Sequence, residues 1–282
     1  MSWSRVIAVA LFVLAGIVVG QPPPPTYIPQ TRFSQGQDVV PTFEGWIKNP
    51  DGMFTLVFGY LNRNHEEELV IPAGNDNKLE PGAADQGQPT FFLTRRRPWN
   101  FRVKVPTDFG NKELVWTLTA NGKTNKAFGS LKSDEEITER IIMTRGNLSP
   151  GFDNPNQPPV VSIRRVDGAV ANQWITLAAD ITDDGLPKPR APKAPTAAAD
   201  SKSQTNTVSN VRIGLSVAWS QYRGPAKATF EQAGPISAPG GGLALTRVRF
   251  LAPGTYVLRA TGTDDAMSVT RDVTVLVAGH QP

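Results

Sequence analysis

The chain contains stretches in which apolar and polar residues alternate with a period of two, the pattern of a β-strand that buries one face. In "WNFRVKV" the apolar positions are Trp99, Phe101, Val103 and Val105, and in "ELVWTLT" they are Leu114, Trp116 and Leu118. We therefore expect two half-buried strands, with these side chains facing inward.

A hairpin is predicted by "GWIKNPDGMFTLVF", in which two apolar runs flank the turn Asn49 to Gly52. Proline presets φ in such a turn, and glycine accepts the positive φ that follows. The only convincing helical pattern is "SDEEITERI", Ser133 to Ile141, where acidic residues favour a helix start. It predicts a short helix or, alternatively, an edge strand.

The second half of the chain is also rich in predicted strands. In "VRIGLSVAWSQY" we expect Ile213, Leu215, Val217 and Trp219 to face inward, and in "DVTVLV" we expect the same of Val273, Val275 and Val277. Strand patterns separated by turn residues, with almost no helical signal, indicate an all-β protein made of two β-sandwich domains.

Breaks in the pattern set the expected boundaries. Residues 1–20 have a short basic start, an apolar run from Val6 to Val19 and a small residue at the end, which is typical of a secretory signal peptide. That run is shorter than the roughly 20 residues of a spanning helix. Residues 21–39 are proline-rich and predict an extended tether.

Residues 147–158 are rich in Pro, Asn and Gly, and we expect them to link two domains, at 40–146 and 159–279. Within the second domain, residues 186–210 have little apolar bulk and predict a disordered insertion.

The composition and charge of the chain exclude several classes of function. The chain has 282 residues and no cysteine, which excludes disulfides and thiol catalysis. Its pI of about 9.4 suggests nucleic acid as a partner, but charges of both signs are interspersed and no basic face is visible, so we do not expect a nucleic-acid partner. His65 lies in "NRNHEEE", where neighbouring strand residues point to opposite faces and cannot converge on a metal.

A family resemblance is carried by four motifs in order: "NQPPVVSI", "WITLAADITDDG", "LSVAWSQY" and "APGTYVLRATGTDD". Together they resemble the strands of PKD-type and related immunoglobulin-like domains of exported bacterial proteins, over about residues 156–279. The resemblance implies a Greek-key sandwich in which Tyr256 begins strand F and bonds backbone through its hydroxyl. It also implies that Trp219 is the buried tryptophan of strand C, faced by Leu177 or Ala179.

The same resemblance places two acidic loops at one end of the sandwich. These loops contain Asp183 with Asp184 and Asp264 with Asp265. Cadherin-like relatives bind calcium through such residues, and calcium accepts six to eight oxygen ligands. A structural calcium ion is therefore the one cofactor that this resemblance implies. The alternative is that these aspartates cap their own turns or pair with arginines.

The first domain resembles an uncharacterised exported bacterial β module, most specifically in "IPAGNDNKLEPG". No activity follows from that resemblance. Asn75, Asp76 and Asn77 in this polar segment are candidate ligand-binding residues, with turn formation as the alternative. Arg95, Arg96 and Arg97 in "LTRRRPWNF" could bind an anionic glycan, with a solvated hairpin tip as the alternative.

No catalytic motif is present, because the chain lacks a nucleophile elbow, a zinc-binding H-E-x-x-H sequence and a phosphate-binding loop. We therefore expect a secreted, non-enzymatic binding, adhesion or structural protein of the bacterial envelope or extracellular space, with a glycan or an envelope protein as partner. The alternative is a polysaccharide hydrolase that uses paired carboxylates. A passive spacer is a third interpretation, and it predicts no concave polar pocket.

Overall fold

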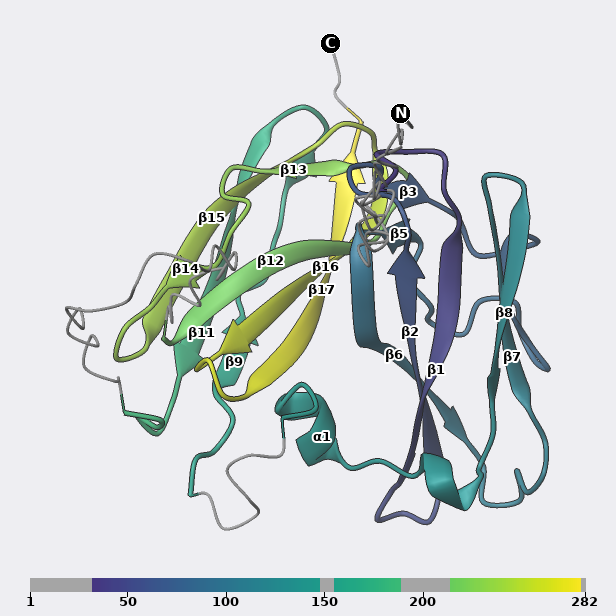
Figure 1. Ribbon diagram of the computed structural model, residues 1–282. Coiled ribbons are helices and arrows are strands. Elements are labelled where there is room, and N and C mark those ends of the chain that lie inside the picture. Colours follow the sequence, from purple (N-terminus) through teal and green to yellow (C-terminus); the bar gives the residue numbers. More distant parts are fainter. Residues whose placement is uncertain (1–31, 148–154, 189–213, 280–282) are drawn as a thin grey trace, which may run out of the picture. The chain divides into compact units, whose positions relative to one another are not determined.

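The computed structural model describes residues 32–147, 155–188 and 214–279. The predicted signal peptide, most of the tether and most of the predicted insertion lie outside these residues. Residues Phe33–Pro282 form one compact unit. Its elements are labelled in Figure 1.

The N-terminal sandwich, residues 33–146, holds the first eight strands. They are β1 (Val39–Lys48), β2 (Phe54–Asn62), β3 (Leu69–Val70), β4 (Asn77–Glu80), β5 (Phe91–Phe92), β6 (Arg95–Val105), β7 (Leu114–Ala120) and β8 (Lys123–Gly129). They form the sheets β1-β2-β6, β4-β7-β8 and β3-β5. Because β1 contacts both β7 and β8, the two three-stranded sheets enclose a common core.

That core is aromatic. Trp116 is fully buried, and its ring centroid lies 4.7 Å from that of Phe101 in an edge-on contact. Phe58 stacks on Phe101 with centroids 5.3 Å apart. The predicted inward positions of both strands are confirmed with the exception of Trp99. The predicted hairpin is confirmed too, since β1 and β2 pair antiparallel and Gly52 has a φ of 82°.

Trp99 is not part of the inward-facing row. The pairing of β2 with β6 shifts register between Phe58 and Tyr60, where a bulge in β6 opposes Gly59. Trp99 itself has a φ of 49° and is only half-buried. A bulge re-aims the side chains on the strand that carries it, so the period of two fails at this position.

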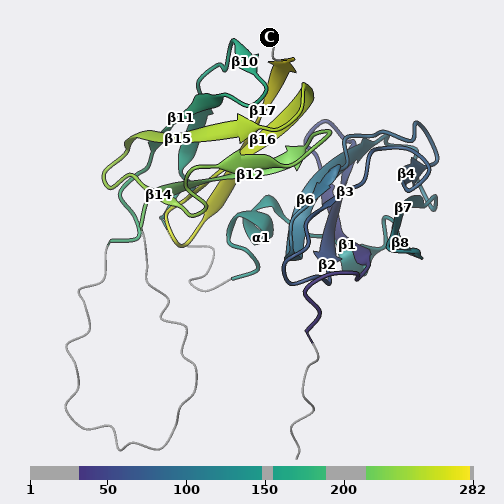
Figure 2. The same cartoon turned by 90° about the horizontal axis from the view of Figure 1, so that it is seen from above.

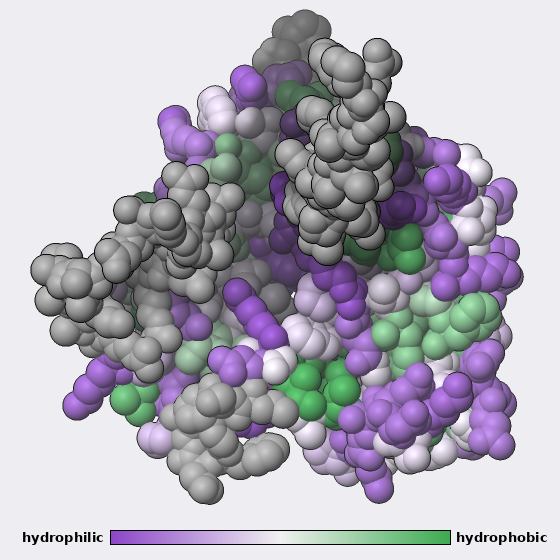
Figure 3. Space-filling model, in the orientation of Figure 1, coloured by the Kyte–Doolittle hydropathy of each residue, from purple (hydrophilic) through white to green (hydrophobic). Residues whose placement is uncertain are grey.

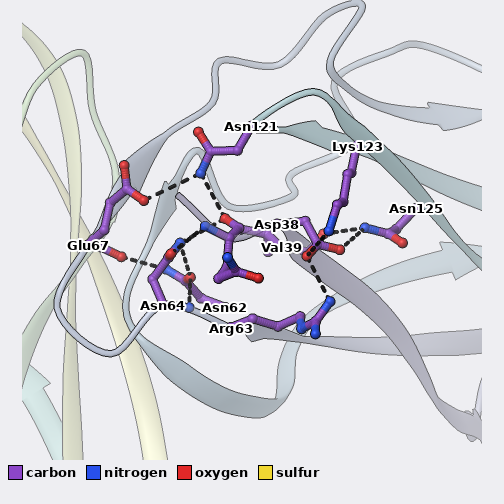
Figure 4. A network of polar contacts seen from close by, with 10 residues as sticks. Asp38, Val39, Asn62, Arg63, Asn64, Glu67, Asn121, Lys123 and Asn125 are labelled. Atoms are coloured by element: carbon purple, nitrogen blue, oxygen red, sulfur yellow. Dashed lines mark hydrogen bonds and ion pairs between the residues drawn. The ribbon is translucent and has the colours of Figure 1, made fainter. Parts of the chain in front are cut away.

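A polar network fixes the start of the N-terminal sandwich (Figure 4). Asp38 is 3% exposed and bonds Arg63 at 3.0 Å and the Asn125 amide at 2.8 Å. Asn64 exchanges hydrogen bonds with the main chain of Gln37. Burial raises the pKa of the Asp38 carboxyl, but the hydrogen bond from Asn125 and the nearby cations outweigh it, so the pKa is lowered overall.

The C-terminal sandwich, residues 155–279, has two sheets. Its strands are β9 (Val160–Ile163), β10 (Ala169–Val170), β11 (Trp174–Thr182), β12 (Ser216–Arg223), β13 (Ala228–Phe230), β14 (Ile236–Ser237), β15 (Gly242–Phe250), β16 (Gly254–Thr263) and β17 (Ser268–Ala278). The sheet orders are β13-β15-β11-β9 and β10-β17-β16-β12-β14, and Figure 2 shows both sheets from above. Lettered by their positions in the sheets, these orders are D-E-B-A and A′-G-F-C-C′, the arrangement of an immunoglobulin-like sandwich, except that β13, in the D position, precedes β14, in the C′ position, along the chain.

Two buried aromatic residues stabilise the core of this sandwich, which has no disulfide. Tyr256 is fully buried, and its hydroxyl donates to the carbonyl of Ala252 at 2.9 Å. Trp219 is 8% exposed and shares a core with Leu177 and Ala179. Both predicted core positions are confirmed. Each ring buries about 150–250 Å² and so contributes several kcal/mol to the core at ~25 cal/mol per Å².

The segment with a helical pattern forms two short helical pieces. They are the 3₁₀ turn η1 (Ser133–Glu135) and the helix α1 (Glu139–Met143), which begins after Thr138, whose hydroxyl accepts from the amide of Ile141. Within the described ranges, neither piece approaches the length and apolar character of a membrane-spanning helix.

Tyr222 belongs to both sandwiches. It lies on β12, yet its ring is part of the N-terminal core, and its hydroxyl donates to the carbonyl of Gly87 at 2.5 Å. Beside it, Arg223 pairs with Asp85 at 2.6 Å. Burial strongly raises the pKa of the Tyr222 hydroxyl. The ring thus holds the two sandwiches together within one unit, and this contact forms one wall of the site described below.

Candidate functional site

A cleft of about 1150 Å³ lies where β6, β12, β16, β17 and α1 meet. Figure 3 shows polar side chains, in purple, around a recess in the middle of one face, with an apolar patch, in green, near the position of α1. Ile142 and Met143 of α1 line the cleft. Strands from both sandwiches therefore contribute to one concave surface.

Arginine dominates the lining. Among the described residues, the only carboxylates in the lining are Glu139 and Asp272, whereas six arginines face the same space. These are Arg96, Arg97, Arg102, Arg145, Arg259 and Arg271. A concave surface with this excess of one charge raises the local concentration of counter-ions.

Three of the six are neutralised by two-pronged ion pairs. Arg96 holds Glu44 through contacts of 2.6 and 2.8 Å. Arg102 holds Glu139 at 2.5 and 2.8 Å. Arg259 holds Asp272 at 2.7 and 2.8 Å. Paired forks of this kind fix both side chains, so these arginines build the walls of the cleft.

Arg259 is the most firmly held of them. Its guanidinium lies 4.0 Å above the Tyr222 ring and donates to the carbonyl of Asn100 at 2.6 Å. Burial lowers the pKa of Arg259, but the bond to Asp272 and the attraction of that carboxylate outweigh it, and the pKa is raised overall. The charge therefore persists although the side chain is mostly covered.

Arg97, Arg145 and Arg271 form no ion pair with any carboxylate in the described parts of the chain. Arg145 donates to the Ser268 hydroxyl at 3.2 Å, and Arg271 donates to the carbonyl of Thr270 at 2.9 Å. All three side chains are exposed. They provide guanidinium groups that remain able to bind an anion.

Trp99 and Arg145 both have a backbone conformation that favours glycine. Their φ angles are 49° and 53°. Arg145 occupies the left-handed position that ends α1, with its amide bonded to the carbonyl of Ile142 and the amide of Gly146 bonded to that of Ile141. A Cβ placed on Gly146 would lie 3.5 Å from Cη2 of Trp99, so the indole packs over this turn. Strain of this kind in a cleft is typical of functional sites.

The predicted arginine run splits between different environments. Arg97 lines the cleft, Arg96 is engaged by Glu44, and Arg95 lies outside the lining. The run is not a hairpin tip, because all three residues pair with β2. The sequence alone does not identify Arg145 and Arg271 as partners of Arg97, since they are far away along the chain.

The predicted polar segment contains one residue with a different role from that expected. Asn77 is fully buried, and its amide donates to the carbonyls of Ile71 and Pro89 while its oxygen accepts from the Trp116 indole at 3.0 Å. With these bonds made, Asn77 is a structural residue. Asn75 and Asp76 are exposed on the same turn, outside the lining of the cleft.

The four predicted calcium-binding aspartates accept hydrogen bonds from the protein itself. Asp183 accepts from the amide of Gly185 at 3.0 Å, and Asp184 accepts from Leu186 and Gln157, both at 2.9 Å. Such bonds to the amide two residues ahead are the turn-capping alternative.

The second pair is bonded in the same way. Asp264, which is 5% exposed, accepts from Ala266, Met267 and the side chain of Asn156, and Asp265 accepts from Gly214. No group of three or more acidic, histidine or cysteine side chains suited to a metal occurs in residues 32–147, 155–188 and 214–279. Burial raises the pKa of Asp183, and the charges of Asp264 and Asp184 add to that rise, so the two loops do lie near each other. Calcium binding stays a prediction.

Two other surfaces have some features of a binding site. A recess of about 510 Å³ is lined by proline, glycine and the mutually paired Asp85 and Arg223, which leaves it without an available charge. On the outer face of the β13-β15-β11-β9 sheet, Trp174 is 41% exposed with Arg247 and Arg249 over its ring at 5.6 and 5.1 Å. Arg247 is paired with Glu231, so the cleft, with three arginines that form no ion pair among the described residues, is the better candidate.

Comparison with known proteins leaves the family open. No family model matches the chain, and no curated protein matches it. Among solved structures, it is similar to the N-terminal eight immunoglobulin domains of Down Syndrome Cell Adhesion Molecule isoform 1.30.30, with 6% identity over 86% of this chain and 27% of that one, at a TM-score of 0.24. It is also similar to the D00-D0 domain of Intimin, with 10% identity over 85% of this chain and 100% of that one, at a TM-score of 0.25. The immunoglobulin-like assignment therefore rests on the strand order given above.

Proposed function

We propose that the protein is a non-enzymatic binding protein and that the arginine-lined cleft is its binding site. One observation carries this proposal: the cleft of about 1150 Å³ has six arginines and two carboxylates among its described lining residues. The volume is at or above the ~300–1,000 Å³ of small-molecule sites, which favours an extended ligand. The passive-spacer interpretation predicts no concave polar pocket, and this cleft argues against it.

The hydrolase alternative needs two carboxylates that face a substrate. The carboxylates among the described lining residues are Glu139 and Asp272, and each is engaged by an arginine fork. Neither is presented to a ligand, so the lining favours binding over hydrolysis.

We further propose that the protein acts outside the cytoplasm, in the bacterial envelope or extracellular space, as an adhesion or structural component. The short basic start and the apolar run before Gly20 support this placement. N-terminal sequencing of the mature protein tests it, with a start near Gln21 as the expected result.

The site can be tested by blocking the cleft. Because the chain has no cysteine, Thr270→Cys gives a unique thiol in the lining, to which a bulky maleimide can be attached. We expect the label to abolish binding to a panel of extracellular polysaccharides and to leave the melting temperature unchanged. The matched control is Thr176→Cys on the outer face of β11, where the same label should have no effect. Equal binding by both labelled proteins, or shortening of the polysaccharide during incubation, would contradict the proposal.

A further inference from the structure

We propose that the ligand of the cleft is an acidic polysaccharide, bound by Arg97, Arg145 and Arg271 and stacked on Trp99. This inference rests on the proposed function and adds the chemical class of the ligand and the residues that recognise it.

The positions of the three available arginines favour a chain of charges over a single anion. Arg97 lies on β6, Arg145 follows the end of α1, and Arg271 lies on β17. All three line one cleft of about 1150 Å³, which is larger than a single small anion needs, so an extended chain of charges fits the space better. Each guanidinium offers a planar fork that suits a carboxylate or a sulfate ester.

The walls are already in place before a ligand arrives. Arg96, Arg102 and Arg259 are each fixed by a carboxylate. Arg259 is also held by the Tyr222 ring and by the main chain of Asn100. Because little side-chain freedom remains to be lost in these walls, binding costs less entropy.

Trp99 supplies the flat apolar surface that a sugar ring needs. It is half-buried and lines the cleft, while the other aromatic residues of the lining, Phe101 and Tyr222, are only 4% and 7% exposed. The described lining thus offers one stacking platform together with the three exposed arginines.

This arrangement favours a polysaccharide over a nucleic acid. Proteins that bind single-stranded nucleic acid combine a continuous basic groove with several aromatic platforms for successive bases. The cleft has one accessible ring, and Glu139 and Asp272 interrupt its basic lining. Successive bases would find only this one platform, whereas a sugar chain does not depend on a series of platforms.

The test measures binding of polygalacturonate by calorimetry to the wild type and to a variant that combines Arg97→Gln, Arg145→Gln and Arg271→Gln. We expect the variant to bind at least about tenfold more weakly and to lose most of the salt dependence, because each charge-assisted contact is strong. The matched control combines Arg95→Gln, Lys112→Gln and Lys126→Gln, which removes the same charge from exposed positions outside the lining. It should bind like the wild type.

A second variant, Trp99→Ala, should weaken binding and leave the salt dependence unchanged, since it removes stacking and no charge. Melting curves of all variants establish that each is folded.

The probe panel separates failure of this inference from failure of the proposed function. Neutral dextran, dextran sulfate, poly-glutamate and single-stranded DNA are measured beside polygalacturonate. Preference for dextran sulfate over polygalacturonate, with the same three arginines required, supports a sulfated source of the acidic chain. Tighter binding of dextran, poly-glutamate or DNA through the cleft would overturn the ligand class and leave the binding function intact. Equal loss of binding in the cleft variant and the matched control would overturn the assignment of the three arginines.

Discussion

At the scale of single residues, the cleft depends on side chains set in uncommon backbone positions. Trp99 and Arg145 both have positive φ, which costs a non-glycine residue of order 1 kcal/mol or more. In each case the surrounding contacts hold the conformation, through a strand bulge for Trp99 and a helix C-cap for Arg145. The C-terminal sandwich contains another locally unfavourable group, the carboxyl of Asp183.

Asp183→Asn is predicted to stabilise the protein at neutral pH. The pKa of Asp183 is raised by burial and by the charges of Asp264 and Asp184. The stabilisation of the folded state that comes from this raised pKa is therefore fully present below the unfolded pKa, near 3.8. It is lost as pH rises through the folded pKa. An amide keeps the bond from Gly185 without the charge. The gain should be below about 1 kcal/mol after solvent screening, and it should vanish below pH 3.8 in melting curves measured against pH.

Asp38→Asn provides the control of opposite sign. Since the pKa of Asp38 is lowered overall, its stabilisation is present above the unfolded pKa and is lost as pH falls through the folded pKa. This variant should lose stability at neutral pH.

Bound calcium would offset the repulsion around Asp183. The calcium prediction is therefore tested by the melting temperature of the wild type, which should rise with free calcium if the ion binds. Destabilisation of Asp183→Asn in calcium-free buffer at pH 7 would contradict the account of the carboxyl.

At the scale of elements, the bulge where β6 passes Gly59 sets the position of Arg97 and Trp99 in the lining of the cleft. A Cβ on Gly59 would lie 2.6 Å from the carbonyl oxygen of Arg97 and 2.9 Å from Cα of Pro98. Both contacts are closer than packed atoms allow. Glycine at this position lets β2 approach the bulged strand, and the bulge turns Trp99 out of the core.

Gly59→Ala is predicted to displace the bulge. Overpacking of this kind costs about 1–3 kcal/mol, so we expect a lower melting temperature together with weaker binding of polygalacturonate. Gly234→Ala is the matched control, because Gly234 is exposed and has no atom near the position of the added Cβ. Wild-type stability and binding in Gly59→Ala would show that the bulge does not shape the cleft.

The outcome for particular elements shows what the sequence can and cannot predict. The hairpin of β1 and β2 and the inward row of Phe101, Val103 and Val105 follow from local rules about turns and strand period. The role of Tyr256 is expected from the resemblance to immunoglobulin-like domains. The position of Trp99 does not, because a bulge depends on the neighbouring strand. The cleft cannot be predicted from local sequence patterns, because Arg97, Arg145 and Arg271 are far apart in the sequence and line one cleft only in the folded protein.

At the scale of the whole described unit, one side chain links the two sandwiches. Tyr222 extends from the C-terminal sandwich into the N-terminal core and lies under Arg259. Residues on both sides are bonded directly, as in the contacts of Arg223 with Asp85 and of Lys227 with Glu68. A binding site built from strands of both sandwiches requires this contact to be stable.

Tyr222→Ala is predicted to uncouple the sandwiches. The change removes the ring from the N-terminal core and leaves the carbonyl of Gly87 without its donor, at a cost of about 3 kcal/mol or more for loss of a large buried ring. Calorimetry should show two thermal transitions in place of one. Tyr256→Phe, which removes only the bond to Ala252, should lower stability by about 1 kcal/mol and keep a single transition. One transition in Tyr222→Ala would contradict the coupling.

The central claim, that the cleft binds an acidic chain, is tested most directly by nuclear magnetic resonance of the side-chain N–H groups. Spectra of the tryptophan indoles and the arginine Nε groups are recorded while polygalacturonate is added. The account predicts that the signals of Trp99, Arg97, Arg145 and Arg271 shift together with one affinity, while those of Trp174 and Arg247 on the outer sheet face stay in place. Shifts confined to Trp174 and its neighbouring arginines would contradict the account.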